Sequence, residues 1–186
     1  QDYRGLVVLN SNVTMDASSA GNISFTSAIN SGISAKSLTI SNGQNILFGA
    51  SIGKSVALTS LAVTSSAATL TGGDVVTSGS GQTYSTILSL GTLAPATVNL
   101  TAGSGTVSFG GSVNMGTKNM TVSGDEIDIA STISATGSNL VLQPGTLFNP
   151  VVVGDNVTSA GLDITATELA NLADGFGSIT IGRGTS

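Results

Sequence analysis

The stretch GTVSFGGSVN, residues 105–114, has two near-copies in the same chain: QNILFGASIG at 44–53 and GNISFTSAIN at 21–30. Each copy has two apolar residues separated by one other residue, which is the pattern of a β-strand with one buried face. A third apolar residue follows after a run of mostly small residues that leaves room for a bend. These near-copies predict a structural unit that is repeated along the chain.

The repeats return at periods of about 20 to 23 residues, within the range of solenoid proteins. Their aligned apolar positions are Ile23, Phe25 and Ile29; Ile46, Phe48 and Ile52; Val107, Phe109 and Val113; and Ile127, Ile129 and Ile133. A degraded copy has Leu70 and Val76, with Gly72 in the place of the large residue. Further strand-like pairs lie between the copies: Leu38/Ile40, Leu61/Val63, Val98/Leu100, Met120/Val122, Leu140/Leu142, Leu162/Ile164 and Ile179/Ile181.

One period is too small to bury its apolar side alone, so successive periods are expected to stack on one another. Strands one period apart would then pair in parallel, with Val, Ile, Leu and Phe inside and Ser, Thr and Asn outside. The crossover rule favours the right-handed form. The sequence therefore predicts an all-β fold for residues 1–186, a single right-handed parallel β-helix (β-solenoid) of about eight coils.

The rival interpretation is an antiparallel sandwich, which also has many short strands. Its hairpins usually contain Asn-Gly or Asp-Gly turns, and SNGQ at residues 41–44 is the one clear turn of this kind before a strand. Repeats at a regular period favour the solenoid instead.

One segment near the C-terminus departs from the strand pattern. Thr165 precedes Glu168 by three residues, which is the spacing of a helix capping box, and Leu169 and Leu172 follow at helical spacing. The sequence predicts a short α-helix at residues 167–174. We interpret it as a loop insertion or a lid over the core, and a binding role is the alternative.

Composition limits the classes of function. Charged residues make up 8% of the chain and the net charge is −5, with only five scattered Lys and Arg residues. This charge argues against binding to nucleic acid or to an anionic membrane surface. The chain has no Cys, His or Trp, which removes thiol catalysis, the commonest general base and the strongest platform for stacking sugars. No apolar run is long enough for a membrane helix.

GQTYSTILSLG at 81–91, followed by VNLTAGSGTVSFGGSVN at 98–114, resembles the repeats of very large bacterial surface exoproteins. These are the filamentous-haemagglutinin-like and autotransporter-like adhesins. ATELANLADGFGSITIGR at 166–183 is similar to a segment of giant repeat proteins of the same type. The resemblance covers residues 22–183. It implies an extended β-helical stalk, secreted or surface-bound, that acts in adhesion or matrix building, and it implies no catalytic residues.

The densest acidic group consists of Asp125, Glu126 and Asp128. Asp128 lies between two inward-facing isoleucines, so its side chain is expected to point outward. Carboxylates on neighbouring coils are candidates for a calcium site or for a sugar-cleaving pair. We interpret the group first as solvated surface charge and expect no cofactor. Tyr84 occupies a strand position and is expected to pack in the core or at a coil edge.

The sequence thus predicts a non-catalytic structural protein of the bacterial cell surface or extracellular matrix. It would be a stalk or adhesin segment, or a filament subunit. The strand-like segments at 4–10 and 177–183 show no evident polar cap, and an uncapped solenoid end invites another chain. The expected partners are therefore another copy, end to end, or flanking solenoid segments, with surface glycans as a further partner. The alternative is a carbohydrate-binding or polysaccharide-cleaving β-helix domain.

Overall fold

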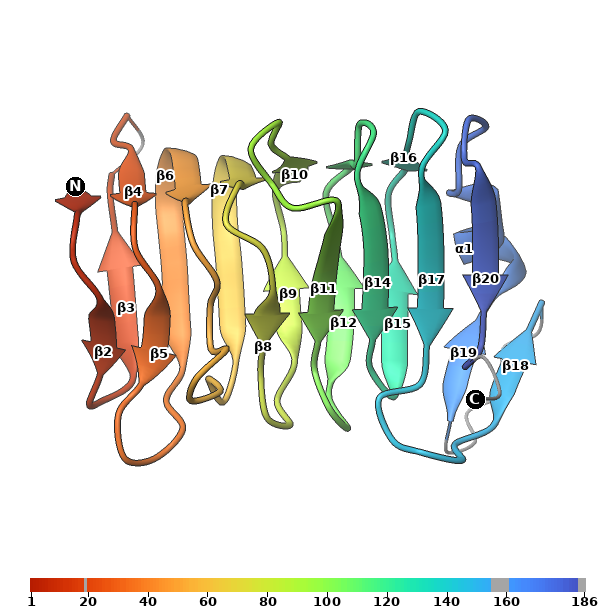
Figure 1. The fold of residues 1–186 in the computed structure, drawn as a ribbon, viewed down its shortest axis with the longest axis horizontal. Coiled ribbons are helices and arrows are strands. Elements are labelled where there is room, and N and C mark those ends of the chain that lie inside the picture. Colours follow the sequence, from red (N-terminus) through yellow and green to blue (C-terminus); the bar gives the residue numbers. More distant parts are fainter. Residues whose placement is uncertain (19, 155–160, 184–186) are drawn as a thin grey trace.

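A computed structural model of the protein describes residues 1–18, 20–154 and 161–183. Within these residues it contains twenty β-strands and one short α-helix. The paired strands run parallel to each other, and most partners lie one coil apart. The fold is the all-β parallel β-solenoid that the sequence predicts (Figure 1).

The first stack of strands lies along the near face of Figure 1. It consists of β2 (Val7–Leu9), β5 (Ile29–Ser31), β8 (Val75–Val76), β11 (Thr97–Thr101), β14 (Asn119–Ser123), β17 (Asn139–Gln143) and β20 (Ser178–Ile181). Ile52 links β5 to β8 through isolated bridges to Ile29 and Val75. The ladder of parallel pairs therefore runs the length of the molecule.

Two further stacks complete the coil, and two long strands, β6 (Leu38–Phe48) and β7 (Leu61–Leu70), belong to both. With the first halves of β6 and β7, the second stack contains β3 (Val13–Asp16), β9 (Gln82–Tyr84), β12 (Thr106–Phe109) and β15 (Glu126–Ile129). With their second halves, the third contains β1 (Asp2–Tyr3), β4 (Ile23–Phe25), β10 (Ile87–Leu90), β13 (Val113–Asn114) and β16 (Ile133–Ser134).

The coil is right-handed, as predicted. In Figure 1 the chain advances from the N-terminus at the left to β20 at the right. The near strands β11, β14 and β17 point downward, whereas the fainter strands β12 and β15 behind them point upward. This combination of rotation and advance defines a right-handed solenoid.

The solenoid makes about six turns, slightly fewer than the eight expected. Near the C-terminus the strand pairing departs from the regular pattern, and Leu162 and Ile164 do not pair with any of the three stacks. They belong to β19 (Leu162–Ile164), which pairs only with β18 (Val151–Val153) in a separate two-stranded sheet.

The two repeat periods are confirmed by the strand registers. Phe25 pairs with Phe48, 23 positions later, and Phe109 pairs with Ile129, 20 positions later. The alignment between the two groups of repeats is wrong, however. Val107 stacks through Gln82 on Leu61 in the second stack, whereas the early copies of the pattern lie in the third stack. The corners between strands differ in length, so the same apolar pattern moves to a different face.

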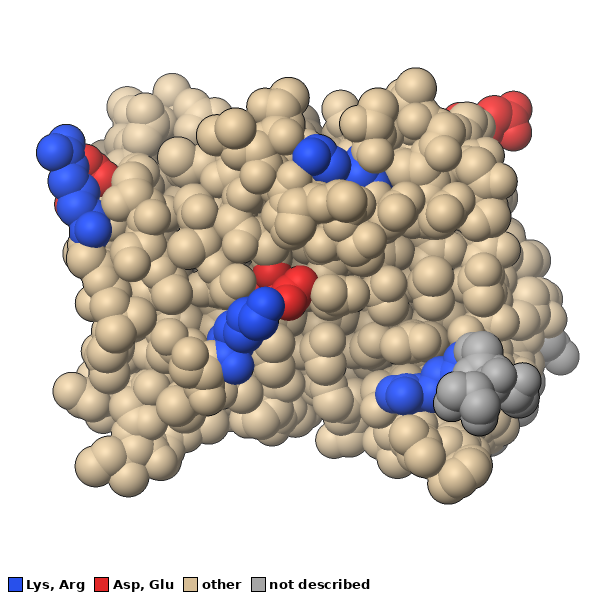
Figure 2. All heavy atoms as spheres, viewed as in Figure 1, with Lys and Arg blue, Asp and Glu red and all other residues tan. Residues whose placement is uncertain are grey.

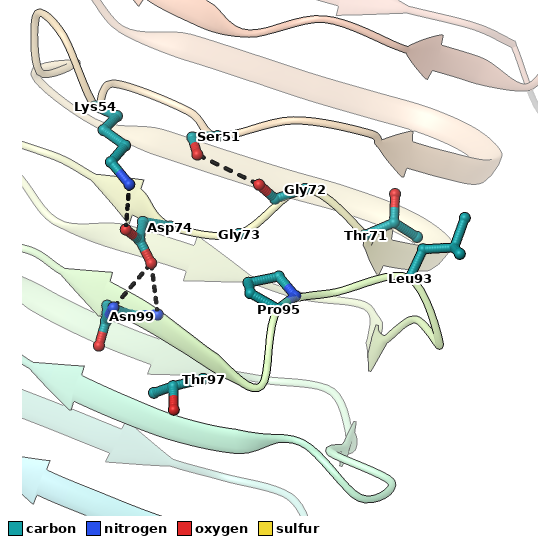
Figure 3. Close-up of a pocket in the computed structure, with 10 residues that line it drawn as sticks. All are labelled: Ser51, Lys54, Thr71, Gly72, Gly73, Asp74, Leu93, Pro95, Thr97 and Asn99. Carbon is teal, nitrogen blue, oxygen red and sulfur yellow. Dashed lines mark hydrogen bonds and ion pairs between the residues drawn. The ribbon is translucent and has the colours of Figure 1, made fainter.

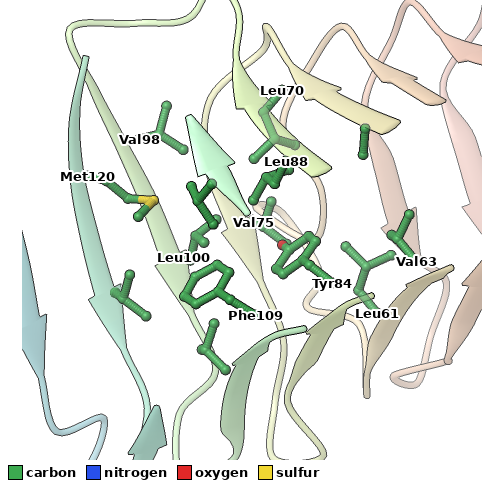
Figure 4. Close-up of a cluster of buried hydrophobic side chains, with 14 of the residues drawn as sticks. Leu61, Val63, Leu70, Val75, Tyr84, Leu88, Val98, Leu100, Phe109 and Met120 are labelled. Atoms are coloured by element: carbon green, nitrogen blue, oxygen red, sulfur yellow. The ribbon is translucent and has the colours of Figure 1, made fainter. Parts of the chain in front are cut away.

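The core is a continuous column of aliphatic side chains with two aromatic ladders. Tyr3, Phe25 and Phe48 stack with ring centroids 5.0 and 5.7 Å apart, and Tyr84 stacks on Phe109 at 5.8 Å (Figure 4). Each such pair is worth about 0.5–1.5 kcal/mol beyond the area that it buries. The expectation that Tyr84 packs in the core is confirmed, since its side chain is fully buried.

The predicted helix at 167–174 is shorter and begins earlier: α1 spans Ala166–Ala170. The capping box of Thr165 and Glu168 is present, with both reciprocal hydrogen bonds. The helix ends early because the chain returns to the solenoid. The N–H of Ile133 donates to Asn171 O at 2.9 Å, and the N–H of Ala173 donates to Ile133 O at 3.0 Å.

Candidate functional site

The three acidic residues singled out in the sequence do not act together. The carboxylate of Asp125 accepts hydrogen bonds from the N–H and the hydroxyl of Thr146, at 2.7 and 2.6 Å. This contact fastens the loop that follows β17 to the coil beside it. Asp125, which directly precedes β15, therefore has a structural role: it holds the loop at Thr146 against the neighbouring coil.

Glu126 and Asp128 lie on β15, and Asp128 is exposed and points outward as predicted. Together with Asp163, Thr165 and Glu168 they line a shallow hollow of about 140 Å³. Although Asp128 is exposed as a residue, its carboxyl and that of Glu126 are partly shielded from water in the hollow, and this raises the pKa of both. The negative charge of Glu168 raises both pKa values further. The ionised forms of Glu126 and Asp128 are therefore less favourable in the folded protein than in water.

In the described part of the chain no group of three or more acidic side chains is arranged to hold a metal ion. Calcium binding by Asp125, Glu126 and Asp128 therefore stays a hypothesis from the sequence.

Residues 165–177 cover the C-terminal edges of β15 and β16. We call this segment the edge cap. The carboxylate of Glu168 accepts a hydrogen bond from the N–H of Ile129 at 3.0 Å, and Asn171 Nδ2 donates to Ile129 O at 2.7 Å. These two side chains satisfy the outward-facing backbone groups of Ile129, as a further strand would. The N–H of Gly137 likewise donates to Gly175 O at 2.6 Å.

The edge cap covers the outer edge of β15, a polar cap that was not expected. It does not cover β20, the strand of the segment 177–183, which among the described residues pairs only with β17. The sequence indicates the helix start through its capping box, and the interpretation of a lid over the core agrees with the observed position. Glu168 has a second role, since it accepts a hydrogen bond from the backbone of β15. This role has no local sequence signal.

The opposite end of the described chain is the first coil, formed by β1, β2 and β3. The N–H of Val7 donates to Ala28 O and the N–H of Gly32 donates to Leu9 O, both at 2.9 Å. Since parallel strands alternate the direction of their backbone groups, the N–H and C=O of Val8 point away from the second coil. Among the described residues β2 pairs with β5 alone, so its other edge is uncovered.

A second hollow lies on the lateral face of the solenoid, and we call it the lateral groove. It has a volume of about 440 Å³ and is lined by Ser51, Lys54, Thr71, Gly72, Gly73, Asp74, Leu93, Pro95, Thr97 and Asn99 (Figure 3). These residues come from successive coils. The groove has no local sequence signal as a whole, because its residues are far apart in the chain, although the degraded repeat at Gly72 marks its position.

An ion pair and an amide hold the centre of the lateral groove. Lys54 Nζ lies 3.1 Å from Asp74 Oδ2, and Asp74 Oδ1 accepts from the N–H and Nδ2 of Asn99 at 3.2 and 2.8 Å. Partial burial acts to raise the pKa of Asp74, but the hydrogen bonds from Asn99 and Lys54 outweigh it and leave the pKa below its ordinary value. Asp74 is therefore an ionised carboxylate that ties three coils together. Figure 2 shows how few other charged side chains lie on this face.

Comparisons with family models, curated proteins and solved structures find no match to this chain. Among the residues described here, no helix is both long and apolar enough to cross a membrane.

Proposed function

We propose that this chain is a non-catalytic structural protein of the bacterial cell surface or extracellular matrix, a stalk or adhesin segment or a filament subunit that assembles through solenoid ends. The observation that carries the proposal is the uncovered edge of the first coil, where the backbone groups of Val8 point outward. Such an edge accepts a further parallel or antiparallel strand. The partner is another solenoid coil, supplied by a second copy or by a flanking segment.

The fold suits a mechanical role. Parallel hydrogen-bond ladders run along the axis and join coils that are about 4.8 Å apart, so that a load along the axis is shared by three stacks of strands. The exterior is dominated by small polar side chains rather than by charge. The cell-surface location is supported by the resemblance of the repeats to those of large bacterial exoproteins.

The assembly is tested by negative-stain electron microscopy and light scattering across a concentration series, with and without a calcium chelator. We expect rods that associate through their ends as concentration rises. The variant Val8→Lys places a charge at the open edge and should abolish association, because edge lysines oppose strand pairing. The control Thr64→Lys adds the same charge at an exposed position of β7, which is paired on both sides, and should associate like the wild type.

Rods that stay separate at every concentration would contradict self-assembly through this edge. Association that persists unchanged in Val8→Lys would place the contact elsewhere on the molecule.

A further inference from the structure

We propose that the lateral groove binds neutral oligosaccharides. The proposal does not depend on assembly through the solenoid ends, because the groove lies on the side of the rod and in the middle of the chain. Its volume of about 440 Å³ is within the range of ligand pockets, about 300–1,000 Å³.

The groove arises from a mismatch between two neighbouring coils. Leu70 pairs with Leu90, and Val75 pairs with Leu100. Counted between these paired positions, the corner from β7 to β8 therefore has five fewer residues than the corner from β10 to β11. The longer corner projects and forms a wall that carries Leu93, whose side chain is 83% exposed (Figure 3).

Two glycines keep the floor of the groove low. A Cβ at Gly72 would overlap the backbone of Ala50, so the chain lies directly against the preceding coil. Gly73 has a φ of +110°, which side chains rarely adopt, and a Cβ there would lie 3.4 Å from Ser51 Oγ and 3.5 Å from Pro95 Cγ. A side chain at Gly73 would therefore fill the space between the walls.

The charge of the groove selects against ionic ligands. Lys54 and Asp74 are its only ionisable lining residues, and they neutralise each other across 3.1 Å. Lys54 is 65% exposed and Asp74 20% exposed at their side chains, so the ammonium group has donors left for a ligand. An anionic glycan would meet the carboxylate beside the only cation, and a cationic ligand would meet Lys54.

The remaining lining groups fit a polyhydroxylated chain. Ser51, Thr71 and Thr97 supply hydroxyls and Asn99 supplies an amide, while exposed Leu93 and Pro95 supply an apolar strip for the C–H face of a sugar ring. An extended peptide has no free strand edge to join here. β11 is paired with β14 along its whole length and with β8 at Leu100 and Thr101. Where β11 lines the groove, the N–H of Asn99 already donates to Asp74 Oδ1.

The test is a titration of the ¹⁵N-labelled chain with maltohexaose, cellohexaose and mannohexaose, with hexagalacturonate as the acidic probe and a Ser/Thr-rich peptide as the extended-chain probe. At least one neutral oligosaccharide should bind with a Kd of about 10 mM or tighter. Its chemical-shift changes should centre on the amides of Gly73, Asp74 and Asn99. Two variants should weaken this binding at least fivefold: Lys54→Met, which removes the ammonium donor, and Leu93→Ser, which removes the apolar wall without touching the ion pair.

The matched control is Lys36→Met, which removes a lysine outside the groove and should bind like the wild type. Circular dichroism establishes that each variant is folded. The proposal is overturned if no neutral oligosaccharide binds, if hexagalacturonate or the peptide binds as tightly, or if Lys54→Met and Leu93→Ser bind as well as Lys36→Met does.

Discussion

The buried hydrogen bond between Tyr84 and Gln82 gives a quantitative test of how the core is held together. Tyr84 Oη donates to Gln82 Oε1 at 2.9 Å, and Gln82 Nε2 donates to Val75 O at 3.1 Å and to Thr101 O at 3.0 Å. Both side chains are at most 1% exposed. Burial raises the pKa of Tyr84, so the phenol stays a neutral donor. The network joins β9 of the second stack to β8 and β11 of the first stack.

The perturbation is Tyr84→Phe, which removes the donor and keeps the ring on Phe109. Gln82 Oε1 then loses this hydrogen bond, and the amide cannot turn away without breaking its two bonds to backbone carbonyls. Leaving a buried acceptor unsatisfied costs about 1–3 kcal/mol. For a chain of this length the midpoint of thermal unfolding should fall by about 2–12 °C.

The assay is urea unfolding followed by far-UV circular dichroism, with the free energy of unfolding compared at constant slope. Tyr3→Phe is the matched control, because Tyr3 Oη also donates to a glutamine, Gln1 Oε1, at 2.8 Å but at an exposed site. Its free energy of unfolding should change by no more than about 0.5 kcal/mol. If Tyr84→Phe costs no more than Tyr3→Phe, the argument that burial makes this hydrogen bond obligatory is refuted.

Two further predictions concern the groove floor and the acidic hollow. Gly72→Ala should lower the free energy of unfolding by about 3 kcal/mol, the upper part of the range for overpacking, since its Cβ would overlap the backbone of Ala50. Gly5→Ala, with open space around its Cβ, should change the free energy of unfolding by less than about 0.5 kcal/mol. Equal effects of the two substitutions would contradict the close contact at Gly72. Partial burial and the charge of Glu168 raise the pKa of Asp128 above its ordinary value of 3.8. Protonated Asp128 therefore contributes stability to the folded state below pH 3.8, and this contribution is lost as pH rises through the raised pKa. Asp128→Asn should therefore raise the thermal midpoint at pH 7, with a gain that disappears below pH 3.8; a gain independent of pH would show that charge is not its cause.

The local pattern of the sequence determined the parallel coil and the inward positions of each strand. An apolar residue at every second position marks a buried strand face wherever it occurs, so the registers of Phe25 on Phe48 and of Phe109 on Ile129 could be predicted from spacing alone. The capping box at Thr165 is also a local signal, and it predicts the helix start to within one residue.

Only the tertiary structure decided which face each strand occupies and which polar groups meet. All three stacks use the same alternation of apolar residues, and corners of unequal length shift the phase, so Val107 lies above Leu61 rather than above Ile46. Lys54, Asp74 and Asn99 meet across coils that only stacking brings together, and Glu168 reaches Ile129 in the same way. Periodicity along a chain fixes what a side chain faces within its own coil, whereas contacts between coils depend on the lengths of the corners, which carry no periodic signal.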